Sequence, residues 1–144
     1  MSGAGRYLKE KNPGVRVVCA DPEGSILKEY FETKKIGDAR PYLIEGIGED
    51  IIPETIHFQY FDEVRSVGDR EAIDITRRLS REEGILIGTS GGAAIVVACQ
   101  VAREAPAGSL IVVIIPDSGE RYLSKVHNDA WMRDQGLLSA HEGS

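Results

Sequence analysis

The sequence predicts an α/β protein with a parallel sheet of about four strands that alternate with helices. Three observations predict this class. Short apolar runs, rich in β-branched residues, recur along the chain, and longer segments of helical composition follow the later ones. Gly, Pro, Asn and Asp separate these segments. The most apolar runs lack the alternation of half-exposed strands, which is typical of strands buried on both faces of a parallel sheet.

Four runs are the predicted strands, and a short helix precedes them. The strands are residues 15–20, 63–67, 85–87 and 110–115. The last reads Leu-Ile-Val-Val-Ile-Ile and is expected at the centre of the sheet. The opening helix carries Tyr7 and Leu8 and stops at Asn12-Pro13-Gly14, because proline cannot continue a helix. Residues 26–62 have weak periodicity and are expected to form a long loop.

Three more helices are expected along the later part of the chain. One begins at Asp69, its expected N-cap, and ends near Glu83. Its apolar stripe consists of Ala72, Ile75 and Leu79. The other two span residues 89–105 and about 121–134, and residues 137–144 are expected to form a flexible tail.

Composition excludes several classes of function. The chain has 144 residues, enough for one domain with a core, and a net charge of −6. Without a basic excess, and with 6% aromatic residues, it is not expected to bind nucleic acid or an anionic membrane. No signal peptide or membrane-spanning run is visible. Cys19 and Cys99 lie in apolar runs and are expected to be buried, reduced thiols of a cytoplasmic protein.

The turn Gly88-Thr89-Ser90-Gly91-Gly92 joins a predicted strand directly to a helix. It lies at the carboxyl edge of the predicted sheet, where α/β proteins bind ligands. The Ser90 hydroxyl can point at a ligand there, and the glycines let a flat or anionic molecule approach the backbone at the helix N-terminus. The alternative is a plain helix cap whose small residues allow tight packing. The turn is not a Walker A loop, because no Gly-Lys-Ser/Thr follows.

Two other loops carry groups capable of chemistry. Asp117 and Ser118 follow the last predicted strand, where they either face the same crevice or cap the next helix. The loop at residues 45–50 contains Gly46 and Gly48, which allow it to close over a small molecule. Its acidic residues are either a general acid or base or simply exposed; they are Glu45, Glu49 and Asp50.

A hydrolase is a second class that these residues allow. Gly88, Ser90 and Gly92 fit the Gly-x-Ser-x-Gly pattern of a nucleophilic serine, and Asp117 and His127 follow in the order that such a triad needs. No metal site is expected, since the histidines show no metal-ligand spacing. The histidines are His57, His127 and His141.

Five segments match one enzyme family in order and cover nearly the whole chain. They are Ser2–Lys9 (SGAGRYLK), Val17–Leu27 (VVCADPEGSIL), Glu45–Pro53 (EGIGEDIIP), Glu83–Ala94 (EGILIGTSGGAA) and Ile115–Met132 (IPDSGERYLSKVHNDAWM). Together they resemble the cystathionine β-synthase and cysteine synthase family, pyridoxal-phosphate enzymes of the tryptophan-synthase β type. The final segment and residues 21–25 are more similar to the cystathionine β-synthase branch. The resemblance implies part of a Rossmann-like large domain, with pyridoxal 5′-phosphate as cofactor and amino acids as substrates.

The resemblance also implies roles for individual residues. Ser90 matches the serine that hydrogen-bonds the pyridine nitrogen of the cofactor. The residues that match the walls of the cofactor site are Gly88, Thr89, Gly91, Pro116 and Asp117. The residues that match the loop closing on the substrate are Gly46, Ile47 and Gly48. Glu49 differs from the aromatic residue that many eukaryotic members carry, which leaves the contacts to the second substrate open.

Some of the family's groups have no counterpart in this sequence. The Gly-Thr-Gly-Gly-Thr phosphate loop and the N-terminal half, which holds the Schiff-base lysine, are not found. The six lysines lie outside a matching context; they are Lys9, Lys11, Lys28, Lys34, Lys35 and Lys125. We therefore expect residues 1–136 to be the C-terminal portion of a catalytic domain, without a catalytic residue of its own and inactive in isolation.

Three functions remain open from the sequence besides the hydrolase. The first is part of a β-replacement enzyme of sulfur amino-acid metabolism that joins serine to homocysteine. The second is cysteine synthase, which joins O-acetylserine to sulfide. The third is a non-catalytic α/β module that binds a ligand or a partner. A homodimer, or association with a separate N-terminal half, is the expected assembly, and because a parallel sheet needs covered edges we expect exposed apolar surface.

Overall fold

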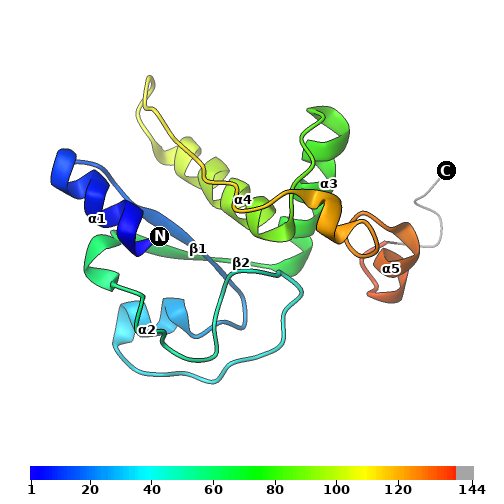
Figure 1. Ribbon diagram of the computed structural model, residues 1–144, viewed down its shortest axis with the longest axis horizontal. Coiled ribbons are helices and arrows are strands. Elements are labelled where there is room, and N and C mark those ends of the chain that lie inside the picture. The colour runs from blue at the N-terminus through cyan, green and yellow to red at the C-terminus, as the bar shows by residue number, and fades with distance from the viewer. Residues whose placement is uncertain (139–144) are drawn as a thin grey trace.

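The computed structural model describes residues 1–138, which form helices around a small parallel sheet (Figure 1). Its elements, in chain order, are α1 (Ser2–Lys11), β1 (Val18–Pro22), α2 (Leu27–Thr33), η1 (Phe58–Tyr60), β2 (Glu63–Val67), α3 (Asp69–Glu82), α4 (Thr89–Glu104), η2 (Gly119–Tyr122) and α5 (Asp129–Asp134). No helix among residues 1–138 combines the length and the apolar character needed to cross a bilayer.

The sheet consists of β1 and β2, which run parallel in a register from Val18 opposite Glu63 to Pro22 opposite Val67. The predicted α/β class with parallel pairing is confirmed. The bounds of β2 are those predicted, whereas β1 begins three residues later than expected and continues to Pro22. Because parallel strands need a long crossover, residues 23–62 connect the two, and they contain α2 and η1 where the sequence predicts only a loop.

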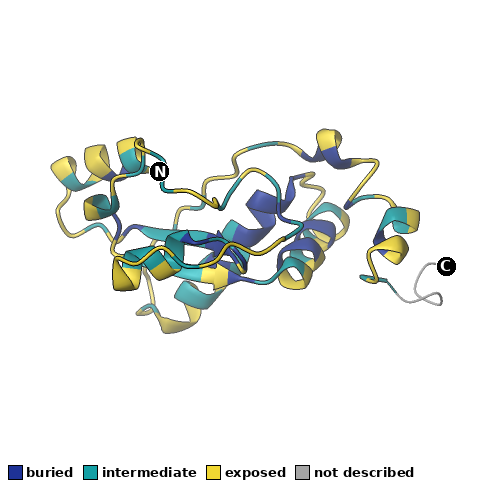
Figure 2. Cartoon of the chain, turned by 90° about the horizontal axis from the view of Figure 1, so that it is seen from below, coloured by how far each residue is buried: buried dark blue, intermediate teal, exposed yellow. Residues whose placement is uncertain are grey.

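The main core lies where α4 packs on both strands and on α3. Its fully buried members are Ile44, Val67, Ala72, Ala93 and Val97. Figure 2 shows the buried residues gathered in this part of the molecule. Gly92 allows the close approach of the two helices, because a Cβ there would collide with Thr76 Oγ1 and the Ala72 carbonyl oxygen. Thr76 is itself buried and donates its hydroxyl proton to Ala72 O, at 2.7 Å.

A second cluster attaches the C-terminal region to α3. It contains Ile73, Tyr122, Val126 and Met132. The buried Arg77 supports it, because its guanidinium donates to the Val126 carbonyl oxygen at 2.8 Å and pairs with Asp129. The expected apolar stripe of α3 is therefore rotated: Ile73 and Thr76 are buried with Ala72, and Ile75 and Leu79 are only half-buried.

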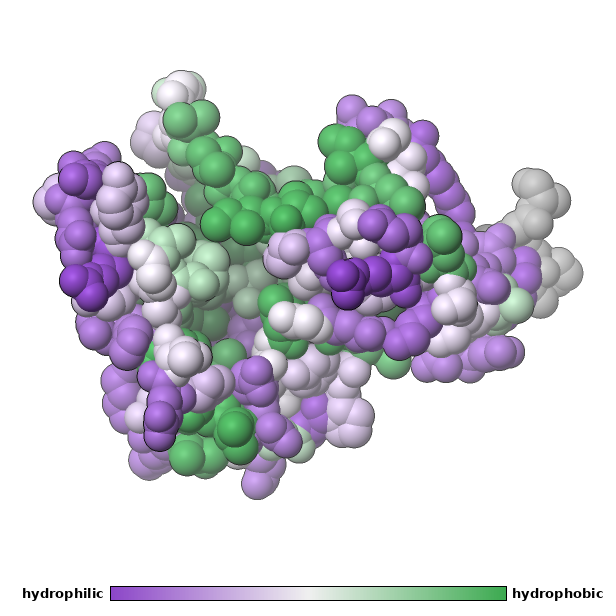
Figure 3. Space-filling view, in the orientation of Figure 1, coloured by the Kyte–Doolittle hydropathy of each residue, from purple (hydrophilic) through white to green (hydrophobic). Residues whose placement is uncertain are grey.

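Two of the four predicted strands do not form within the described residues. Residues 85–87 contribute one bridge, from Ile87 to Ser118, and residues 110–115 pair with no strand. Leu110 and Val112 are 89% and 78% exposed. A strand exists only through hydrogen bonds to a neighbour, and none of the described strands lies beside this run. Figure 3 shows the resulting hydrophobic band along the segment that follows α4, so the expected exposed apolar surface is confirmed.

The ends of the helices also differ from expectation. The N-cap of α3 is Gly68, and the Asp69 carboxylate instead accepts from the Leu43 and Ile44 amides at 2.8 and 3.2 Å. The predicted last helix is divided into η2 and α5, where Asn128 caps α5 by accepting from the Ala130 amide at 2.8 Å.

The expected tail begins at Leu137 and Leu138, which pack partly against the second cluster. Residues 139–144, with the rest of that tail and His141, lie outside the described residues.

The two cysteines are free thiols in different surroundings. Cys19 on β1 is half-buried, and burial raises the pKa of its thiol to about 11. Cys99 is exposed, so the expectation of a buried thiol is wrong there.

Candidate active site

Ser90 lies in the first turn of α4, at the point where residues 85–88 meet the helix, and is 2% exposed. The helix begins after Gly88 and receives no hydrogen bond from a capping side chain. Within residues 1–138 the Ser90 hydroxyl forms no hydrogen bond, so it does not serve as the plain cap that the sequence also allows. A serine hydroxyl carries one donor and two acceptor positions, so this one is able to form hydrogen bonds to a ligand.

The loop at residues 45–49 lies directly against Ser90. A Cβ placed on Gly46 would be 3.9 Å from Ser90 Oγ, with no closer neighbour. Gly46 and Gly48 have φ values of +86° and +80°, the left-handed region that glycine adopts without strain. Ile47, between them, packs against the main core. Of the three predicted substrate-loop residues, the structure thus places Gly46 against the serine predicted to bind the cofactor.

The loop at residues 116–119 is the third part of the site. A Cβ at Gly88 would collide with the Asp117 carboxylate and the Tyr122 ring, so this glycine permits the contact between the two loops. The Tyr122 hydroxyl donates to Asp117 Oδ2, and this bond raises the pKa of Tyr122 to about 12. Asp117 Oδ1 is buried and has no partner within the described residues, whereas Pro116 is exposed.

The glycines of the Ser90 turn also have packing reasons of their own. A Cβ on Gly91 would lie 3.1 Å from Ile87 Cδ1 and 3.2 Å from Ile115 Cγ2. Thr89 is buried, and its hydroxyl accepts from the Glu45 amide at 3.0 Å. Small residues in this turn therefore serve close packing, and their contact with a cofactor stays a prediction.

The hydrolase arrangement does not form. His127 Nε2 is 3.1 Å from the Ile87 carbonyl oxygen, and Asp117 is hydrogen-bonded to Tyr122. Across the described part of the chain, no hydrogen bond joins Ser90 to either of them. A nucleophilic serine needs a base within hydrogen-bond reach, so the structure gives no support to that class.

Glu45, one of the candidate acidic residues of the loop at residues 45–50, lies at the edge of the site. The Glu45 carboxylate pairs with Lys125 Nζ at 2.6 Å, and both side chains are nearly half exposed.

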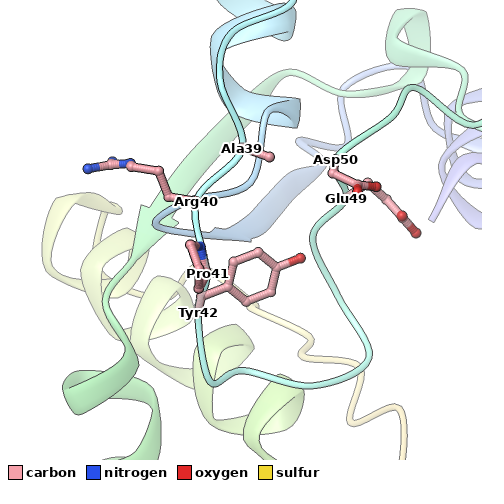
Figure 4. A pocket seen from close by; sticks show the side chains of 6 residues that line it. All are labelled: Ala39, Arg40, Pro41, Tyr42, Glu49 and Asp50. Atoms are coloured by element: carbon pink, nitrogen blue, oxygen red, sulfur yellow. The ribbon is translucent and has the colours of Figure 1, made fainter.

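A hollow of about 400 Å³ beside the loop is lined by residues that do not include Ser90: Ala39, Arg40, Pro41, Tyr42, Glu49 and Asp50. Figure 4 shows Arg40 directed away from Glu49 and Asp50. Burial, followed by the charge of Glu49, raises the pKa of Tyr42. Within residues 1–138, no three His, Cys, Asp or Glu side chains gather as metal ligands do.

The sequence analysis does not identify the groups that hold these loops in place. Ser25 forms hydrogen bonds to the backbone of Glu49, and Asp69 holds residues 43 and 44. Both are polar residues next to glycine in a turn, a pattern common to many surface loops, so their targets far along the chain left no signal in the sequence.

The fold and the site define an α/β protein whose loops gather around the hydroxyl of the buried residue Ser90 at a helix N-terminus. The model of the family described as "Pyridoxal-phosphate dependent enzyme" matches residues 1–117. The chain belongs to this family.

Relatives of known name agree with this assignment. Cystathionine β-synthase of Oryctolagus cuniculus is 41% identical over 99% of the chain, and the match spans 26% of the relative. The O-acetylserine dependent cystathionine β-synthase of Bacillus subtilis is 40% identical over 86% of the chain and 38% of the relative. The chain therefore spans about a quarter to two fifths of the length of these relatives.

Solved structures share the fold. The O-acetylserine dependent cystathionine β-synthase of Helicobacter pylori matches with a TM-score of 0.73 and 40% identity, over 85% of this chain and 38% of that one. O-ureido-L-serine synthase matches with a TM-score of 0.79 and 30% identity, over 99% and 40%. The predicted resemblance to the cystathionine β-synthase and cysteine synthase family is confirmed, and pyridoxal phosphate is the cofactor of that family.

The residues present fit one side of this cofactor. A pyridine nitrogen is a hydrogen-bond acceptor, and the hydroxyl of the buried residue Ser90 is a donor that forms no hydrogen bond within the described chain. Gly46 presents no side chain on the side that faces this hydroxyl. The fit extends to the ring side of the site, formed by Ser90, the Gly46 loop and the Asp117 loop.

Proposed function

We propose that this chain forms the pyridine-nitrogen side of the active site in a pyridoxal-phosphate enzyme of the β-replacement type. The reaction proposed for the whole protein joins serine to homocysteine. The Cβ–O bond of serine breaks, a Cβ–S bond forms to the thiol sulfur, and water leaves. The observation that supports this proposal most directly is the Ser90 hydroxyl, which forms no hydrogen bond within residues 1–138 and lies against the Gly46 loop. The names of the relatives supply the reaction class.

Ser90 has a defined task in this proposal. When bound, pyridoxal phosphate supplies an electron sink for bonds at the α-carbon of an amino acid. The Ser90 hydroxyl donates to the ring nitrogen and holds the ring in register with the loop. A neutral hydroxyl does not stabilise a positive charge on that nitrogen as a carboxylate would. The ring then withdraws electrons less strongly, which favours elimination and replacement at Cβ.

Three of the six lysines are paired with carboxylates, which supports the proposal that these residues alone are inactive. Lys9 pairs with Asp62 at 2.7 Å and Lys28 with Glu32 at 2.6 Å. Lys125, the lysine closest in sequence to the site loops, pairs with Glu45 at the rim. We expect borohydride treatment of the chain with pyridoxal phosphate to fix no pyridoxyl group on any one lysine, as read by peptide mass spectrometry.

An activated serine is the second candidate substrate. The relatives from Bacillus subtilis and Helicobacter pylori are both named as O-acetylserine dependent, and they are about as similar to this chain as the rabbit enzyme. Identity therefore does not separate serine from O-acetylserine. Sulfide in place of homocysteine, the cysteine synthase reaction, is the corresponding alternative for the second substrate.

The chain is further proposed to associate with the polypeptide that corresponds to the rest of its relatives' length. The support is the apolar run at residues 110–115, which includes the 89% exposed Leu110 and has no strand beside it within residues 1–138. A strand from that polypeptide would pair with this run and cover its side chains. This occupant agrees with the fraction of each relative that the chain matches.

A chimera tests the function. This chain replaces the matched region of the Bacillus subtilis relative, and the product is assayed with serine or O-acetylserine and with homocysteine or sulfide. We expect cofactor binding and β-replacement, with the preferred pair identifying the substrates. A correctly folded chimera that binds the cofactor and catalyses none of the four reactions contradicts the proposal. A lysine of this chain labelled specifically by borohydride contradicts the inactivity of the chain alone.

A further inference from the structure

The loop at residues 45–49 is attached to the protein at both of its ends. At one end, the Glu45 amide donates to Thr89 Oγ1 at 3.0 Å. At the other, the Glu49 amide donates to Ser25 Oγ at 3.0 Å, and the Ser25 hydroxyl returns a bond to the Glu49 carbonyl oxygen at 3.3 Å. The two anchoring hydroxyls belong to different parts of the fold, one at the start of α4 and one just before α2.

The two anchors differ in exposure, because the Ser25–Glu49 bonds are exposed and the Thr89–Glu45 bond is partly buried. Thr89 is 3% exposed, so its bond to Glu45 is shielded from water. Ser25 Oγ also accepts from the Leu27 amide at 3.3 Å, and the Ile26 amide donates to the Glu49 carbonyl oxygen at 3.0 Å. One serine hydroxyl thereby joins the first residue of α2 to the end of the loop.

The loop between the anchors is closely packed at Gly48 and open at Gly46. A Cβ on Gly48 would lie 2.7 Å from the Tyr42 hydroxyl oxygen and 2.8 Å from Pro22 Cδ, so this end is packed closely. At Gly46, by contrast, a Cβ would meet only Ser90 Oγ, at 3.9 Å, so the loop is not closely packed there. The backbone that faces Ser90 is therefore placed by its attachments at Glu45 and Glu49.

We propose that Thr89 and Ser25 are positioning residues, which fix the backbone of the Glu45–Glu49 loop over Ser90. The inference rests on the proposed function for the meaning of the site, since it assigns to these hydroxyls the task of placing the substrate loop. The exposed Glu45–Lys125 ion pair is a minor addition, because pairs of this kind contribute little in water. The specific claim is that loop order depends on two hydroxyl groups.

Amide hydrogen exchange of the full chain, read by NMR, tests the claim without cofactor. In Thr89→Val the Glu45 amide should exchange about tenfold faster, and in Ser25→Ala the Glu49 amide should do so, since each loses its acceptor. Thr89→Ser and Ser25→Thr keep a hydroxyl and should restore protection. Unchanged protection of these amides overturns the inference, as does an equal loss over β1 and α3.

Two matched controls separate positioning from general support. Thr76→Val removes the hydroxyl of another buried threonine, which should lower overall stability without a selective effect at Glu45. Ser109→Ala removes an exposed bond to the Pro106 carbonyl oxygen and should leave Glu49 unchanged. A selective loss of Glu45 or Glu49 protection in either control contradicts the inference.

Kinetics of the chimera add a second readout. Thr89→Val and Ser25→Ala should each raise the KM of the serine substrate about tenfold, and Ser25→Ala should leave the absorption spectrum of the bound cofactor unchanged. An unaltered KM in both variants contradicts the positioning role. An inactive parent chimera counts against the proposed function, and the exchange experiment then decides the inference alone.

Discussion

Two predicted strands of this molecule have opposite fates. The first is β2, whose last residue, Val67, is fully buried between β1, α4 and the loop residue Ile44. The run at residues 110–115 is more apolar, yet Leu110 is 89% exposed. The difference is a partner strand: β2 has β1 beside it, whereas residues 110–115 pair with no strand among the described residues. Hydrophobic composition therefore indicates a tendency to be covered, and a neighbouring strand is needed to realise it.

The largest expected effect lies on the buried side of the comparison. In Gly92→Ala the new Cβ meets Thr76 Oγ1 and the Ala72 carbonyl oxygen, so α4 must move away from α3. We expect the free energy of unfolding in urea to fall by about 3 kcal/mol. Gly3→Ala is the matched control, because no atom lies within 4 Å of its Cβ, and a helix-interior alanine should add roughly 0.5–1 kcal/mol. Equal stabilities of the two variants would show that the helices are not in close contact.

The exposed side of the comparison predicts the reverse. Leu110→Lys and Val112→Lys change side chains that touch water, so the free energy of unfolding should change by no more than about 0.5 kcal/mol. Sedimentation velocity should show less self-association, since two charges interrupt the apolar band. A loss above about 1 kcal/mol in the monomer would mean that this run is packed in the chain itself.

A smaller effect concerns the carboxyl ends of the strands. Asp21 at the end of β1 is 2% exposed, with Oδ1 lacking a partner in the described chain, and burial raises its pKa. The native state then binds this proton more tightly than the unfolded state. The contribution of Asp21 is complete below its unfolded pKa of about 3.9, and it is lost as pH rises through the folded value.

The pH dependence is measured as the difference in unfolding free energy between the natural chain and Asp21→Asn. We expect the natural chain to lose stability relative to the variant as pH rises from 4 towards 7. Glu63→Gln is the opposite control, because a hydrogen bond from Arg65 lowers the pKa of Glu63 and its contribution is lost as pH falls. A difference for Asp21→Asn that does not vary with pH contradicts the expected shift.

Much of the fold follows from local sequence, and the limits have physical causes. Residues 63–67, the 69–82 helix and the 89–104 helix are predicted closely, because spacing and flanking glycines define them. The two missing strands could not be judged from their own residues, since pairing is a property of a neighbour. Asp69 reads as a cap by position, but its carboxylate has better donors at residues 43 and 44.

The candidate site shows the same division. Ser90 and the Gly46 loop are found from local motifs, and the structure places them together. The anchors Ser25 and Thr89 act on Glu49 and Glu45, which lie 24 and 44 residues away in the chain. Contacts over such separations are set by the tertiary fold, so no single-sequence pattern identifies them.

Cofactor affinity of the chimera with and without the Ser90 hydroxyl tests the central claim most directly. We expect Ser90→Ala to weaken binding of pyridoxal phosphate up to about tenfold, the value of one hydrogen bond, and to reduce β-replacement. Ser109→Ala, whose hydroxyl lies in the loop after α4, should leave both unchanged. Equal affinity and equal activity in Ser90→Ala and the natural chimera would contradict the assignment of Ser90 to the cofactor.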